Sequence, residues 1–128
     1  MITVYADSSA LVKLTLDEPE STAIRAFIDQ FDEVATSRIG FVETRRVVAR
    51  AGGDLAAAAG VLNGIGPIDL DTTIIESAVA IVPTTLRTLD AIHLASALAL
   101  YAVDAFVTYD NRLAEAARDA GLTVVSPA

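Results

Sequence analysis

The sequence predicts an α/β fold in which a short parallel sheet carries helices on both faces. Short apolar runs rich in β-branched residues alternate with longer amphipathic segments along the whole chain, and this alternation is typical of a parallel sheet covered on both sides. The length of 128 residues is that of one ordinary domain. Because no repeat, low-complexity tract or long linker divides the chain, we expect residues 1–128 to form a single domain.

In the first half of the chain, polar residues that favour helix N-termini precede each amphipathic segment. Ser8 and Ser9 are expected to cap the first helix, Ser37 the third and Asp54 the fourth. The expected elements are strands at residues 2–6 and 34–36, and helices at about 8–16, 21–31, 38–51 and 54–63.

The second half of the chain continues the same alternation and ends on a strand. Thr88 is expected to cap a helix whose apolar residues lie on all sides, so we expect that helix to be buried. The expected elements are strands at residues 67–70, 105–108 and 122–125, and helices at about 72–82, 89–101 and 111–120.

Composition excludes several classes of protein. No apolar run approaches the roughly 20 residues that span a bilayer, and the chain contains no cysteine for disulfides or thiolate metal sites. The start of the sequence lacks the pattern of a signal peptide, so we expect a soluble cytoplasmic protein with no membrane contact. The formal net charge of −8 opposes broad affinity for nucleic acids, which normally requires clustered Lys and Arg.

Three aspartates follow expected strands or begin expected helices. Asp7 follows the first strand, Asp110 follows the strand at 105–108, and Asp90 lies in the first turn of the helix at 89–101. Taken one at a time, each is explained by helix capping or by attraction to the helix dipole. Their positions alone therefore leave a structural role open.

Glu43 is harder to explain by local structure. It shares a helix face with the apolar residues Ile39 and Val47, four residues to either side. An ion pair with Arg46 is the local alternative, and it is worth only a few tenths of a kcal/mol. A carboxylate on a core-facing stripe requires a partner, so Glu43 is a candidate functional residue.

The four acids together predict a cation site. In an open parallel sheet, ligands bind beyond the carboxyl ends of the strands, where the strand order reverses. Carboxylates converging there at about 4 Å would repel by about 4 kcal/mol per pair at an effective dielectric near 20. Such a cluster therefore holds extra protons or a hard cation, and an oxygen-only ligand set suits Mg²⁺ or Mn²⁺. These ions support phosphodiester hydrolysis by water.

His93 is the only histidine in the chain, so catalysis by a pair of histidines is unavailable. Because nothing nearby in the sequence pairs with His93, we expect a packed or hydrogen-bonded helix residue rather than a catalyst.

Four stretches of the sequence, in order, resemble the PIN-domain ribonucleases and among them the VapC toxins. They are residues 4–13, 37–46, 87–95 and 106–113. The resemblance implies a three-layer α/β/α sandwich with a short central parallel sheet, and endonucleolytic cleavage of RNA by water. It assigns Asp7, Glu43, Asp90 and Asp110 to a catalytic site that holds Mg²⁺, with Mn²⁺ as a substitute.

Beside these four acids, Ser8, Thr108 and Asn111 are candidates for hydrogen bonding to the metal ligands or to a metal-bound water, although capping is the favoured explanation for Ser8. Because the chain is acidic, RNA binding would depend on local cations. The candidates are Lys13, Arg38, Arg45, Arg46, Arg50, Arg87 and Arg112.

The resemblance also implies partners. A VapB-like antitoxin would wrap a C-terminal segment around the protein and place a cation near the acidic site. We expect that segment in a groove lined by the helices at 21–31 and 38–63. The resemblance further implies a homodimer, or a heterotetramer or octamer with the antitoxin.

Three other classes of protein share part of this pattern. A haloacid-type phosphatase requires an aspartate where Ser9 stands, and a receiver domain requires a lysine near the last strands, whereas Lys13 is the only lysine. A catalytically silent PIN-like interaction module remains the alternative to an enzyme. The presence of all four acids opposes it.

Overall fold

Five parallel strands form a single sheet in the computed structural model, which describes residues 3–128. They lie in the order β3-β2-β1-β4-β5. Their bounds are β1 (Thr3–Ala6), β2 (Glu33–Ser37), β3 (Gly66–Ile68), β4 (Ala105–Val107) and β5 (Val124–Val125). All five predicted strands are confirmed with small shifts at their ends, except that the first was predicted from Ile2, which lies outside the described residues.

Seven helices, counted over residues 3–128, connect and cover these strands. They are α1 (Ser8–Thr15), α2 (Ser21–Ile28), α3 (Arg38–Arg50), α4 (Leu55–Leu62), α5 (Thr72–Val79), α6 (Thr88–Leu98) and α7 (Asn111–Asp119). Each corresponds to a predicted helix. In the part of the chain that the structure describes, no helix is long and apolar enough to cross a bilayer.

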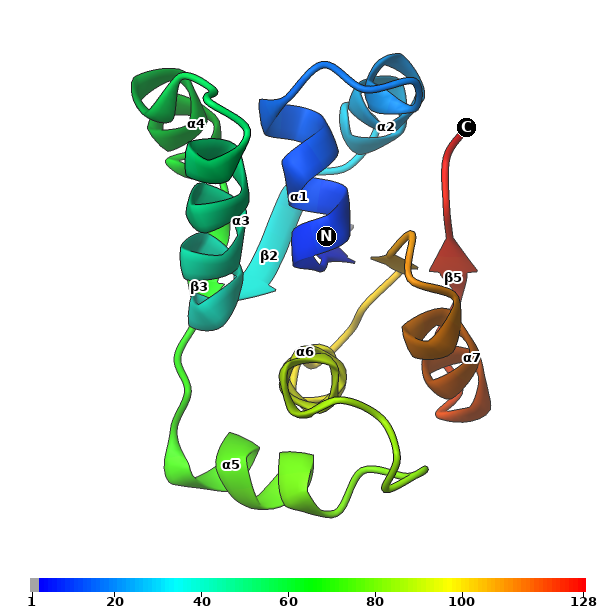
Figure 1. Cartoon of the computed structure of the whole chain (residues 1–128). Helices are drawn as coiled ribbons and strands as arrows, with labels where there is room; N and C mark the ends of the chain where they lie inside the picture. Colours follow the sequence, from blue (N-terminus) through cyan, green and yellow to red (C-terminus); the bar gives the residue numbers. More distant parts are fainter. Residues whose placement is uncertain (1–2) are drawn as a thin grey trace.

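Strands β1 and β4 are buried along their whole length. Neighbouring residues of a strand point to opposite sides of the sheet, so these strands contribute to the core on both faces. Val4 and Ala6 of β1 pack with residues of α1, α2 and α4. Tyr5, between them, packs with Phe106 of β4 and with residues of α6 and α7 on the other face. Helix α5 lies outside α6 (Figure 1). The predicted α/β sandwich with a central parallel sheet is therefore confirmed.

Two of the predicted helix caps are wrong. Asp7, rather than Ser8 or Ser9, caps α1, since its Oδ1 accepts a hydrogen bond from the Ala10 backbone N–H at 3.0 Å. Helix α6 begins one residue earlier than predicted, so the cap position is taken by Arg87, which makes no side-chain capping bond. The sequence offers several adjacent polar residues at each start, and only the backbone path selects among them.

The predicted burial of α6 is correct for one side of the helix. Leu94 and Ala97 pack in the core, whereas Leu89 and Leu98 are 46% and 42% exposed. An apolar residue on every side of a short helix does not require every side to be covered.

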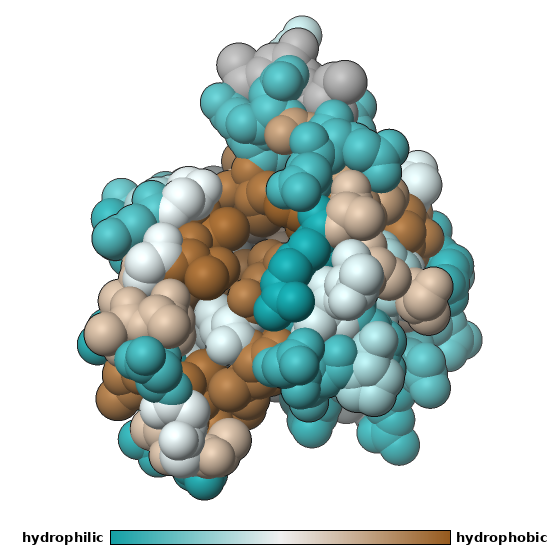
Figure 2. Space-filling view, turned by 90° about the horizontal axis from the view of Figure 1, so that it is seen from above, coloured by the Kyte–Doolittle hydropathy of each residue, from teal (hydrophilic) through white to brown (hydrophobic). Residues whose placement is uncertain are grey.

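An apolar hollow opens on the face that carries α2 and α4. Figure 2, seen from the top of Figure 1, shows apolar residues gathered around this hollow. Helix α1 contacts α2 on one side and α3 and α4 on the other, so it forms a floor between them. Leu55 and Val61 of α4 are exposed, and Phe27 and Phe31 are only partly buried against the core cluster that contains Leu11 and Leu62.

Candidate active site

The four predicted acids come from four elements and line one pocket. The strand order reverses direction around β1, which pairs with β2 on one side and with β4 on the other. Asp7 directly follows β1, and Asp110 lies just beyond β4. With Glu43 of α3 and Asp90 of α6, they line a pocket of about 550 Å³ at this edge of the sheet. Carboxylates that are far apart in sequence therefore share one cavity.

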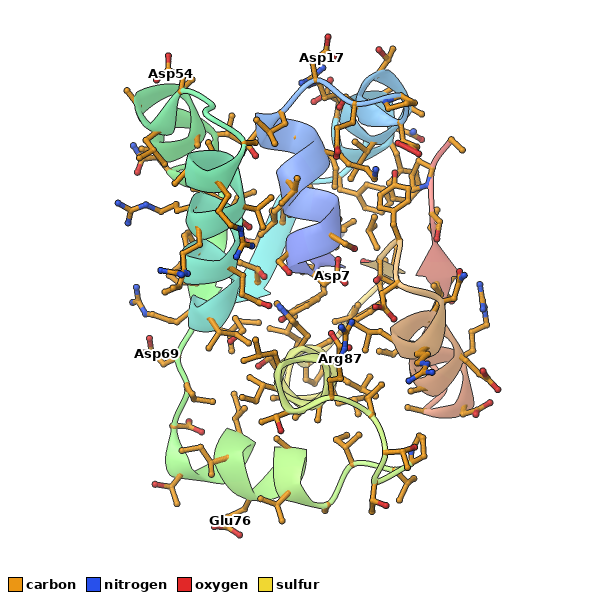
Figure 3. The ribbon with its side chains drawn as sticks, in the orientation of Figure 1. Asp7, Asp17, Asp54, Asp69, Glu76 and Arg87 are labelled. Atoms are coloured by element: carbon orange, nitrogen blue, oxygen red, sulfur yellow. The ribbon has the colours of Figure 1, made fainter. Side chains whose placement is uncertain are left out.

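Figure 3 shows Asp7 and Arg87 in the space between α1, α6 and α7. Acids outside the site lie at the periphery of the same view, and these are Asp17, Asp54, Asp69 and Glu76. Much of the negative charge of the chain is therefore held on solvated surfaces away from the pocket.

Asp7 is the most enclosed of the four, with 3% of its surface exposed. Its Oδ1 accepts hydrogen bonds from the Ser9 hydroxyl at 2.6 Å and from the Ala10 N–H. Its Oδ2 accepts from the Thr108 hydroxyl at 2.6 Å. Burial nevertheless raises the pKa of Asp7, because the hydrogen bonds only partly replace water.

Arg87 bridges two of the acids. Its Nε lies 3.2 Å from Oδ2 of Asp90, and its Nη2 lies 2.8 Å from Oδ2 of Asp110. Burial and the neighbouring Asp110 raise the pKa of Asp90, while Arg87 opposes this shift. The Arg87 side chain is 72% exposed, so it is free to leave the two carboxylates without disturbing the core.

Glu43 has a partner that the sequence did not reveal. Its Oε1 lies 2.7 Å from Nε2 of His93, whose side chain is 1% exposed. The local alternative, an ion pair with Arg46, is absent among the described residues, and Arg46 is exposed. His93 is a packed, hydrogen-bonded helix residue as predicted, and its partners Tyr5 and Glu43 lie far from it in the sequence.

Hydroxyl groups connect the acids to one another. Thr108 donates to the Asp7 carboxylate and accepts from the backbone N–H of Asp110 at 3.1 Å, so one hydroxyl links the Asp7 side chain to the backbone of Asp110. Ser9, which sequence reasoning missed as a site residue, donates to Asp7 and accepts from the Tyr109 N–H at 2.9 Å. Ser8 lines the pocket beside them. Asn111 is exposed at the start of α7 and lies outside the pocket lining.

The candidate RNA-binding cations are scattered. Lys13 lines the pocket, but it is paired with Glu20 at 2.8 Å and its Nζ lies 4.7 Å from the centre of the Tyr109 ring. Arg112 lines a separate depression together with Glu115 and Asp119. Of the predicted cations, only Lys13 and Arg87 therefore lie at the pocket, and both are held by carboxylates.

The donor set of the pocket fits a divalent cation by its chemistry, since four carboxylates provide only oxygen ligands. Within residues 3–128, however, no group of three or more Asp, Glu or His side chains is already arranged to hold a metal ion. The carboxylates are not arranged around a common point because protein donors bind them instead. Arg87 holds Asp90 and Asp110, and His93 holds Glu43. Binding a cation here would require Arg87 to move.

The raised pKa of Asp7 predicts how stability depends on pH in the absence of metal. The folded state binds the proton of this carboxyl more tightly than the unfolded state, whose pKa is near 3.8. The free energy of unfolding attributable to Asp7 therefore decreases as pH rises from below 3.8 through the raised folded value, and then levels off. Urea denaturation of wild type and Asp7→Asn, with chelator at a series of pH values, gives the difference between their free energies of unfolding. A difference in favour of wild type that grows as pH rises would contradict the prediction.

Comparison with known proteins identifies the class to which this fold and site belong. A family model described as the PIN domain matches residues 4–119. The chain is therefore a PIN domain.

Curated relatives narrow the class. Ribonuclease VapC47 of Mycobacterium tuberculosis (strain CDC 1551 / Oshkosh) is 44% identical, over 97% of this chain and 96% of that protein. Ribonuclease VapC46 of M. tuberculosis (strain H37Rv) is 37% identical over 99% of each chain. The chain thus belongs to the VapC ribonucleases of the PIN-domain family.

Solved structures share the fold. M. tuberculosis VapC20, described as a Sarcin–Ricin loop cleaving toxin, has a TM-score of 0.76 at 19% identity and covers 97% of this chain and 99% of its own. A toxin–antitoxin complex from Klebsiella pneumoniae has a TM-score of 0.74 at 22% identity and 98% coverage of both chains.

Proposed function

We propose that this protein hydrolyses RNA phosphodiester bonds as a divalent-metal-dependent endoribonuclease and acts as the toxin of a toxin–antitoxin pair. The observation that carries the proposal is the meeting of Asp7, Glu43, Asp90 and Asp110 in one pocket. The ribonuclease activity named for relatives that match the chain over nearly its full length supports the same activity. No observation favours the catalytically silent interaction module.

In this proposal the four acids hold Mg²⁺, with Mn²⁺ as a substitute. The cation, when bound, supplies activation of water and polarisation of the scissile phosphate. Thr108 and Ser9 keep the Asp7 carboxylate oriented toward the pocket through their hydroxyl groups. Arg87, released from Asp90 and Asp110, remains at the mouth of the pocket as a guanidinium that can pair with an RNA phosphate.

The antitoxin belongs to the same proposal. Structures of related fold are described as a toxin–antitoxin complex from Klebsiella pneumoniae and as VapBC2 from Rickettsia felis bound to promoter DNA. We place the antitoxin segment on the apolar hollow whose floor is α1, between α2 and the α3–α4 pair. An Arg or Lys of that segment would be attracted to the acidic pocket.

Two further parts of the proposal concern assembly and location. Exposed apolar residues on α5 and the segment after it, including Ile75, Val79 and Val82, favour a homodimer, alone or within a larger complex with the antitoxin. A toxin that cleaves cellular RNA works where that RNA is, so we propose a cytoplasmic protein.

Cleavage of defined RNAs by purified wild type and Asp90→Asn tests the activity. We expect cleavage by wild type with Mg²⁺ or Mn²⁺, loss with chelator, and a decrease of about 100-fold or more in Asp90→Asn, because the substitution removes a charge from the pocket while keeping its size. The matched control is Asp69→Asn, which removes an exposed acid outside the pocket. Equal cleavage by wild type and Asp90→Asn would point to a contaminating nuclease.

A further inference from the structure

We propose that Tyr5 and His93 are positioning residues that hold Glu43, so that one of its carboxylate oxygens is engaged and the other is presented to the pocket. The inference rests on the proposed function, because it concerns how Glu43 is prepared for a divalent cation. It starts from a chain of three side chains on β1, α6 and α3 that crosses from the core to the pocket.

The chain of hydrogen bonds is buried at one end and open at the other. The Tyr5 side chain is fully buried, and its hydroxyl lies 2.6 Å from Nδ1 of His93. His93 Nε2 lies 2.7 Å from Glu43 Oε1, and the Glu43 side chain is 24% exposed at the pocket. The three groups therefore connect the sheet to the site.

The hydrogen-bonding capacity of each group selects one form of the imidazole. An ionised Glu43 only accepts, so the short contact requires a proton on Nε2 of His93. At the other end, the Tyr5 oxygen already accepts from the Ser37 N–H at 3.0 Å, and its own proton is available for Nδ1. Both ends thus favour the neutral Nε2–H tautomer, in which every group of the chain is satisfied.

A glycine allows α3 to come close enough for this contact. A Cβ atom at Gly40, one turn before Glu43, would lie 2.6 Å from the Thr36 hydroxyl oxygen and 3.4 Å from Cε1 of His93. The first distance is too short for a Cβ atom with Thr36 in its present position, so glycine permits this approach of α3 to β2. The close packing brings Glu43 within reach of the buried imidazole.

The consequence for Glu43 is a defined orientation. Oε1 is held by His93, whereas Oε2 has no hydrogen-bond donor within residues 3–128. Groups that hydrogen-bond to metal ligands fix the direction of the ligand atoms, and their removal typically weakens metal affinity by about 10- to 100-fold. His93 and Tyr5 would therefore act on the cation only through Glu43.

The first test reads the tautomer directly. Because His93 is the only histidine of the protein, a long-range proton–nitrogen correlation spectrum of the metal-free protein contains one imidazole to assign. We expect the Nε2–H form in wild type and also in Tyr5→Phe, because Glu43 still accepts from Nε2–H in that variant. An Nδ1–H imidazole in wild type would overturn the inference.

The second test measures Mn²⁺ affinity by calorimetry. We expect His93→Leu to weaken Mn²⁺ binding by about 10- to 100-fold, and His93→Gln, whose amide can donate from a similar position, to restore most of it. Ser96→Ala is the matched control, since Ser96 is a fully buried polar residue of the same helix that has no hydrogen-bond partner among the described residues. We expect its affinity to equal that of wild type.

The outcomes separate this inference from the proposed function. A wild-type protein that does not bind Mn²⁺ would overturn the proposed metal site and the inference with it. Wild-type binding together with an equal Mn²⁺ affinity in folded His93→Leu and in Tyr5→Phe would overturn the inference alone. If His93→Leu does not fold, Tyr5→Phe decides: an Mn²⁺ affinity equal to that of wild type overturns the inference, and a weaker affinity supports it.

Discussion

Replacing Asp7 with asparagine is expected to lower RNA cleavage by at least about 100-fold while the protein stays folded. Asp7 is the most enclosed acid of the pocket and accepts three hydrogen bonds, from Ser9, Ala10 and Thr108. Asparagine keeps an oxygen for the helix cap but removes the charge that would bind a cation. Because burial raises the pKa of Asp7, removing the charge does not remove a stabilising group at neutral pH.

Two measurements on Asp7→Asn check this result together. Cleavage of a defined RNA with Mn²⁺ gives the loss of activity, and thermal unfolding with and without Mn²⁺ shows whether the stabilisation by the metal disappears in parallel. Asp17→Asn, which changes an exposed acid at the end of α1, serves as the control. Retention of Mn²⁺-induced stabilisation by the Asp7 variant would place the metal elsewhere.

Replacing Phe106 with alanine is expected to lower the free energy of unfolding by about 3–5 kcal/mol. Phe106 is fully buried in β4 and stacks on the Tyr5 ring with centroids 5.3 Å apart and an interplanar angle of 3°. The truncation leaves a cavity between the sheet and the α6–α7 layer, and the flanking residues refill it only partly. The loss is a large fraction of the roughly 5–15 kcal/mol that stabilises a typical domain.

Urea denaturation followed by circular dichroism measures the effect of Phe106→Ala. Val79→Ala, at a position of α5 that is 76% exposed, is expected to change the free energy of unfolding by no more than about 0.5 kcal/mol. Similar values for the two variants would mean that the Tyr5–Phe106 stack is not part of a tightly packed core.

Local patterns were sufficient to predict the elements of the fold. The alternation of short apolar runs and amphipathic segments predicted all strands and helices of the described chain, because strand and helix periodicity depend on residues within a few positions of one another. The predicted helix starts were less accurate where several polar residues follow one another in the sequence. Ser8, Ser9 and Asp7 are all able to cap α1, and Asp7 does so.

Part of the pocket was also predictable. Asp7 and Asp110 follow strands whose carboxyl ends meet at one edge of a parallel sheet, so their proximity follows once those strands are neighbours. The strand order that makes them neighbours is a property of the whole fold. The hydrogen-bond partners of the acids also depend on the whole fold, since Arg87 reaches Asp110 across 23 positions of sequence and Thr108 reaches Asp7 across 101.

The succession of strands and helices, the acidic residues and the resemblance to a nuclease family can all be recognised in the amino-acid sequence. The donor that each acid meets follows instead from the packing of the folded chain: His93 for Glu43, Ser9 rather than Ser8 for Asp7, and Arg87 for both Asp90 and Asp110. The reason is physical. Periodicity and capping arise from contacts within one turn or strand, whereas a hydrogen bond between distant side chains depends on how closely whole helices approach the sheet.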